Sequence, residues 1–187
     1  MSYIGSKRSS SLVSFDEGTI GSGVVFPAGH VIKIEQTIVS GAQTVTTGNS
    51  WGTAISVSIQ TTKANSKILV IPNVYFGLLY DEGYNGAARI IRNYPSNSTL
   101  AIGSTTIHST TNTVGHYHIS DSENTRWQQS MSLIIRDTPN APAGTTIEYK
   151  IQATILGGNG GEAIYMNRWA LNGDLSGVST LTVMETS

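Results

Sequence analysis

The sequence has 187 residues, no cysteine, and eleven Lys and Arg against twelve Asp and Glu, for a formal net charge of -1. The lack of cysteine excludes disulfides and thiolate metal sites, and so few cations make nucleic acid a poor partner. No apolar run approaches the roughly 20 residues that span a bilayer, so no membrane insertion is expected. Hydroxyl groups replace charges as the source of solubility, with 23 Ser and 22 Thr.

Residues 1–28 have no sustained hydrophobic period and are predicted to form a short extended N-terminal leader. Lys7 and Arg8 are followed by serines rather than by an apolar h-region, so this is not a signal peptide. The leader is either a disordered tail or a segment that orders on a partner, and its small apolar clusters favour the second. The candidate residues for attachment to that partner are Tyr3, Ile4, Leu12, Val13 and Phe15.

From residue 30 apolar and polar side chains alternate, which predicts a strand with two unlike faces. The two faces carry Ile32, Ile34 and Ile38 against Lys33, Glu35 and Thr37. A polar stretch over 41–52 leads to a second alternating strand over 55–60.

Residues 67–80, KILVIPNVYFGLLY, are apolar on both faces, which is typical of a strand buried on both sides. Pro72, Asn73 and Gly77 argue against a helix. Because Pro72 cannot donate to a ladder, the strand is expected to bend or bulge there or to lie at an edge. A short strand is predicted over 87–93, and weaker strands are predicted over 100–108 and 114–120.

Residues 126–156 carry the clearest local signal in the chain. An apolar run over 131–135 and a connector with two prolines, TPNAPAG, precede an alternating strand over 147–155. The pattern predicts a β-hairpin, with partners in 66–74 and in the closing strand over 179–185. A further strand is predicted over 163–169.

About nine or ten short strands without an amphipathic helix predict an all-β fold. The expected architecture is a single jelly-roll-like antiparallel β-sandwich over 29–187, behind the leader over 1–28.

His116 and His118 fall on one face of a strand, and with His108 they could form three ligands of a zinc or nickel site. Polar strand residues on a solvated or subunit-facing surface explain them better, so no metal or other cofactor is predicted. The acidic loops over 81–82 and 121–124 lack the spacing of a calcium loop and are better explained as solvated turns.

No catalytic motif occurs, so a non-enzymatic protein is predicted. Binding is easier to support, because flat rings in loops can stack on sugars or fill a pocket of a partner. Trp127 and Trp169 are expected in the core or an interface, and Tyr84 is the best exposed ring. The candidate recognition surface consists of Tyr80, Asp81, Glu82, Tyr84, Asn85 and Tyr117.

Four segments resemble a known family when taken in order. They are GHVIKIEQT, NSKILVIPNV, SMSLIIRDTPNAPAGTTIEYKIQ and STLTVMETS. Over residues 29–186 the chain resembles a family of small β domains in virion appendage proteins of tailed bacteriophages, notably those of marine bacteria and cyanobacteria. The opening MSYIG resembles the first residues of tail-fibre-type proteins, where this end attaches to the particle.

The resemblance implies a structural protein of the virion, a homotrimeric tail fibre or knob held to other virion proteins by its leader. It places variable recognition of a host surface glycan or protein in residues 80–124, and release by host lysis. The alternatives are a capsid decoration or head-fibre protein of the same fold and, less favoured, a protein that binds or cleaves glycans.

Overall fold

The computed structural model describes residues 28–47, 50–79, 85–93, 104–110, 126–156, 163–168 and 177–187. These residues contain eleven strands and no helix. The strands are β1 (Val31–Val39), β2 (Gln43–Thr47), β3 (Gly52–Gln60), β4 (Lys67–Leu79), β5 (Asn85–Asn93), β6 (Ser104–Thr110), β7 (Arg126–Ser132), β8 (Ile135–Asp137), β9 (Thr146–Leu156), β10 (Ala163–Met166) and β11 (Ser179–Thr186).

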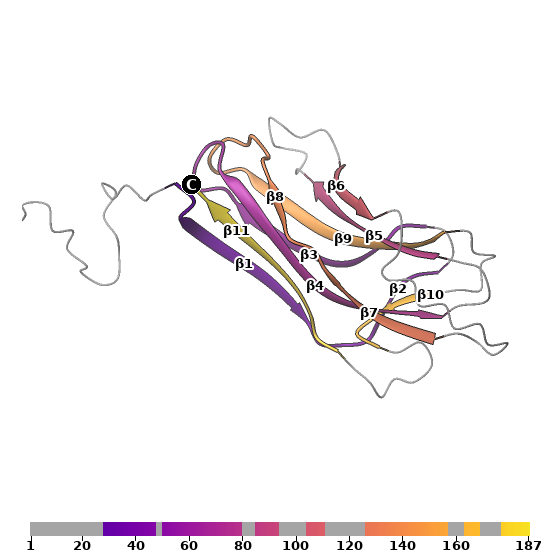
Figure 1. Cartoon of the computed structure of the whole chain (residues 1–187). Helices are drawn as coiled ribbons and strands as arrows, with labels where there is room; N and C mark the ends of the chain where they lie inside the picture. The colour runs from indigo at the N-terminus through magenta and orange to yellow at the C-terminus, as the bar shows by residue number, and fades with distance from the viewer. Residues whose placement is uncertain are drawn as a thin grey trace, which may run out of the picture.

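The strands form two antiparallel sheets that pack face to face (Figure 1). In the first, sheet A, β1 pairs with β11 and β11 with β4. One edge of β4 pairs in turn with β11 and β10, and the other edge pairs with β8 and β7. The second, sheet B, has the order β3-β9-β5-β6.

The chain crosses repeatedly between the two sheets, as a jelly roll requires. Reading β10 with β11 and β7 with β8 as single positions, each sheet has four main strands, and β2 extends sheet A beside β10. The order across sheet A is then first, last, third and sixth, and across sheet B second, seventh, fourth and fifth. This is the double Greek key of a jelly roll, so the predicted all-β jelly-roll-like sandwich is confirmed.

The predicted hairpin over 126–156 is wrong, because its two halves lie in different sheets. β7 and β8 pair with β4 in sheet A, whereas β9 pairs with β3 and β5 in sheet B. Of the two expected partners, β4 is correct for the first half and β11 for neither, since β11 pairs with β1 and β4. The connector crosses the end of the sandwich, where Gly144 N donates to Thr61 O and Asn65 N donates to Ala141 O.

Pro72 lies in the middle of β4, in a central strand rather than at an edge. Its ladder with β11 is continuous, but the opposite edge is interrupted between Val70, which pairs with Ile135 of β8, and Asn73, which pairs with Ser132 of β7. The pairings of β4 with β7 and of β4 with β8 follow the same register. β7 and β8 are therefore one strand broken where proline has no N–H to donate.

The core lies between the inner faces of the two sheets. The alternation of apolar and polar residues in the sequence identifies many of the side chains that form it. The five apolar residues on the inner face of β9 are at most 1% exposed, namely Ile147, Tyr149, Ile151, Ala153 and Ile155. The inner face of β4 contributes four more at 2% or less, Ile68, Val70, Val74 and Phe76. β2 lies in the stretch that the sequence indicated only as polar.

Candidate interaction surface

Most residues predicted for recognition, metal binding or attachment lie outside the described residues. These are Tyr80, Asp81, Glu82, Tyr84, Tyr117, His116 and His118, the five leader residues, and Trp169. Asn85 and His108 lie in β5 and β6, and Trp127 in β7, but their side chains are not described. Those predictions stay predictions. Within the described residues no three His, Asp or Glu side chains lie close enough together to hold a metal ion.

The first buried polar group links the two sheets through Asp137. Its carboxylate accepts hydrogen bonds from Arg92 Nη1, at 2.9 and 3.1 Å, and from the Tyr149 hydroxyl, at 2.7 Å. Asp137 belongs to sheet A, and Arg92 and Tyr149 to sheet B. A buried carboxylate held by a guanidinium and a hydroxyl is satisfied within the protein, and the group acts as a tie between sheets.

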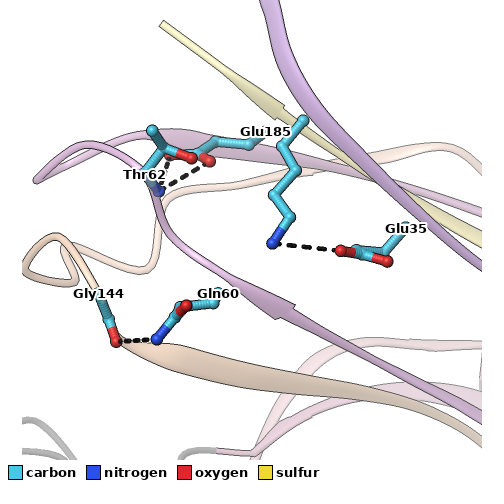
Figure 2. A network of polar contacts seen from close by, with 6 residues as sticks. Glu35, Gln60, Thr62, Gly144 and Glu185 are labelled. Carbon is cyan, nitrogen blue, oxygen red and sulfur yellow. Dashed lines mark hydrogen bonds and ion pairs between the residues drawn. The ribbon is translucent and has the colours of Figure 1, made fainter.

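The second buried polar group is Glu185, which is fully buried at the end of β11. Its two carboxylate oxygens accept hydrogen bonds from the backbone N–H of Thr62, at 2.8 and 2.9 Å (Figure 2). The backbone N–H of Lys63 donates a third bond, at 3.0 Å. Burial by itself raises the pKa of Glu185, but the hydrogen bonds from Lys63, Ser66 and Thr62 lower it, and the net effect is a lowered pKa. Glu185 is therefore a charged clamp on the loop between β3 and β4.

Asn167 is the third such group, just after β10 and fully buried. Its Nδ2 donates to Val39 O and Gly41 O, at 2.7 and 3.2 Å, and its Oδ1 accepts from the Ser179 hydroxyl at 2.6 Å. Its backbone has φ 59°, a left-handed conformation that Asn tolerates better than most residues. Asn167 thus joins the ends of β1, β10 and β11.

The outer face of sheet B is polar and internally paired. Arg89 lies 3.9 Å over the ring of Trp51 and donates two hydrogen bonds to Gln152 Oε1, while Gln152 donates to Thr53. Glu148 pairs with Lys150 at 3.0 Å on the same face. Such a face is stable in water as it stands.

The outer face of sheet A is different in chemistry. Cross-strand register aligns Ile34 of β1 with Met184 of β11, Leu69 of β4 and Arg136 of β8. The next row contains Gln36, Thr182 and Ile71, and Gln36 Nε2 donates to the Thr182 hydroxyl at 2.7 Å. We call six residues of these rows and their neighbours the apolar outer face: Ile34, Ile38, Leu69, Ile71, Ile134 and Met184.

Three members of the apolar outer face are largely exposed in the single chain. Ile34, Ile38 and Ile134 are 55, 60 and 63% exposed, and the other three are half-buried. One exposed isoleucine is ordinary, but three exposed isoleucines on one sheet face form the kind of apolar area that is typical of protein contact surfaces. Within residues 67–77, the prediction of burial on both sides holds for the inner face, whereas on the outer face Leu69, Ile71 and Tyr75 are half-buried and Asn73 is exposed.

The free edge of sheet A has a different character from its face. Among the described strands β1 pairs with β11 alone. Lys33 and Glu35 form an ion pair at 3.2 Å, and Figure 2 labels its Glu35 end. The pair lies on the side of β1 that is in register with the buried Glu185 and Val183. Charges that point inward at an edge oppose the addition of another strand, so the face is the better candidate for contact.

Sequence reasoning missed the apolar outer face, although its signals were present. The first signal was the set of three isoleucines on one face of residues 30–38. The second was the presence of apolar residues on both faces of residues 67–80. A strand pattern shows that two faces differ, but it does not say which face the fold turns inward. The described part of the chain contains no helix with the length and apolar character needed to cross a membrane.

Comparisons with known proteins give structural neighbours alone. No family model matches the sequence, and no curated protein matches it. A structure of the infectious bursal disease virus Gt strain superposes with a TM-score of 0.40 at 12% identity, over 90% of this chain and 42% of that one. A VP2 subviral particle of the same virus gives 0.36 at 11% identity, over 90% and 41%. The chain thus spans about two fifths of these structures, and at such TM-scores the fold assignment rests on strand order alone.

Proposed function

We propose that this chain is a non-enzymatic structural protein of a virion. The observation that carries the proposal is a jelly-roll sandwich with one sheet face on which Ile34, Ile38 and Ile134 are largely exposed among the described residues. Jelly rolls are the common fold of capsid and lectin domains, and an uncovered apolar sheet face is what a subunit needs in order to pack into an assembly. The buried polar groups around Asp137, Glu185 and Asn167 are all committed to holding the fold.

The finer form of the proposal is a homotrimeric tail-associated appendage of a tailed bacteriophage. It is supported by the resemblance over residues 29–186, by the low charge of the chain, and by the leader that precedes β1. In this form the first leader residues, with Tyr3 and Ile4, attach to the particle, and the segment over 80–124 contacts the host surface.

Antibody labelling of intact particles tests this proposal. We expect label on the tail, and label confined to the capsid faces would reassign the protein to decoration of the capsid. Absence of the protein from purified particles, as measured by mass spectrometry, would remove the virion assignment altogether.

A further inference from the structure

We infer that the apolar outer face of sheet A binds a second copy of this chain. The inference rests on the proposed structural function and names the partner of the surface described above. Ile34 and Ile38 project from β1, and Ile134 lies between β7 and β8 beyond β4. Leu69, Ile71 and Met184 lie on the strands between them. Burying such side chains contributes about 25 cal/mol per Å² of apolar surface removed from water.

The whole outer face of sheet A, of which the apolar outer face is one part, is close to the size that a stable contact between copies needs. Four strand positions at about 4.8 Å spacing and nine residues at about 3.4 Å rise make a projected area of roughly 600 Å² before side-chain relief is added. A standard interface buries about 800 Å² of accessible surface per partner. A flat sheet face also has a natural complement in another sheet face, since sheets pack on each other in β-sandwiches.

Charge favours the same partner. The whole chain has a formal net charge of -1, so two copies scarcely repel each other. Among the described strands, the rows that contain Ile71 and Ile38 carry no charged residue, whereas Lys67, Arg126 and Arg136 belong to other rows of the sheet. The part of the face around Ile38 and Ile71 therefore offers no charge with which a strongly charged partner could pair.

The contact uses the face and not the edge or the other sheet. The Lys33–Glu35 pair guards the edge of β1. On sheet B, Arg89, Gln152 and Glu148 already pair within the face. A contact there would have to break these pairs, whereas a contact on sheet A would cover mainly apolar side chains, beside the Gln36–Thr182 hydrogen bond.

Light scattering and analytical ultracentrifugation of the full chain test the inference. The wild-type chain is expected to have a multiple of its 19.9 kDa mass. Ile34→Lys and Ile134→Lys are each expected to raise the dissociation constant about tenfold or more, since they place a charge in a desolvated contact. Ser58→Lys is the matched control, because Ser58 is exposed on the outer face of sheet B opposite Glu148. It should leave the mass unchanged.

The cysteine-free sequence allows a second, independent measurement. A thiol introduced by Ile134→Cys should react more slowly with maleimide at high protein concentration and recover on dilution, while Ser58→Cys should react at one rate throughout. Protection of Ile134→Cys that does not change with concentration would assign the cover to a segment of the same chain, such as the leader, and overturn the inference.

A monomeric wild-type chain would also overturn the inference, as would association that both lysine variants leave intact. Particle labelling is a separate readout, so a failure of the virion assignment is distinguishable from a failure of this contact.

Discussion

The hydroxyl of Tyr149, on β9, donates a hydrogen bond of 2.7 Å to the carboxylate of Asp137, on β8, and so joins the two sheets within the core. Tyr149→Phe removes one donor and is expected to lower the free energy of unfolding by about 1–2 kcal/mol. Asp137→Ala also deprives the Arg92 guanidinium of its buried partner, and is expected to cost about 3–5 kcal/mol.

Urea unfolding at neutral pH measures both effects. Tyr165→Phe is the matched control, since it removes a hydroxyl from a half-buried ring on β10, and a change within about 0.5 kcal/mol is expected. Equal losses for Tyr149→Phe and Tyr165→Phe would contradict a structural role for the tie between sheets.

Glu185 predicts a loss of stability in acid. Its pKa is lowered in the folded chain from an ordinary value of 4.5, so its stabilising contribution is fully present above that value. It is lost as the pH falls below 4.5 and through the lower folded pKa, because the folded state must then take up a proton that the unfolded state already holds.

Glu185→Gln should therefore lower the free energy of unfolding by about 1–3 kcal/mol near neutral pH. The difference from the wild type should shrink as the pH falls below the ordinary value. Glu35→Gln removes the same charge from the exposed pair with Lys33 and should change stability by less than about 1 kcal/mol. A difference between wild type and Glu185→Gln that is independent of pH would rule out the charged clamp.

Asn167 combines a strained backbone with three side-chain hydrogen bonds, and two substitutions separate the contributions. Asn167→Gly keeps φ 59° at no steric cost but loses the bonds to Val39, Gly41 and Ser179, for an expected loss of about 2–4 kcal/mol. Asn167→Asp places a carboxylate oxygen against the carbonyls of Val39 and Gly41 and should be the more destabilising at neutral pH. Thermal unfolding of both variants measures the two losses of stability. A larger loss for Asn167→Gly than for Asn167→Asp would contradict this expectation.

Gly52 marks a close approach of two backbones at the start of β3. A Cβ at this position would overlap the carbonyl oxygen of Val45, on β2. Gly52→Ala is therefore expected to force β2 away from β3 and to lower stability by about 2 kcal/mol or more. Gly41→Ala is the control, because a Cβ there meets nothing within 4 Å. Thermal melts that do not separate the two variants would show that β2 yields freely.

Period-two alternation was enough to predict most of the strands and the residues they bury. It identified the inner faces of β3 and β9 and the shared face of Leu181 and Val183 on β11, all of which are buried. These predictions succeed because strand geometry is local, and the side-chain period does not depend on which strands become neighbours.

The failures concern relations between distant segments. The connector between β8 and β9 looks the same in sequence whether it joins neighbours in one sheet or crosses to another. Likewise, Ile34 and Ile38 of the edge strand β1 point outward because the inner side of this strand carries the ion pair of Lys33 and Glu35. Neither fact can be read from neighbouring residues in the chain, since both depend on pairing between strands that are far apart in the sequence.

Gly29 and Ser187 are hydrogen-bonded to each other where β1 begins and β11 ends, at the end of the sandwich where Figure 1 marks the C-terminus. The resistance of the domain to mechanical force should therefore depend on the direction of pulling. A pull between the leader and the loops at the far end of the sandwich would act along β1 and strain the eight residue pairs of the β1–β11 ladder together. A pull between the leader and Ser187 would open the same ladder one pair at a time. A subunit tethered by its leader and loaded at its far end is therefore expected to resist force better than the same subunit pulled from Ser187, which single-molecule stretching with the two attachment geometries would measure.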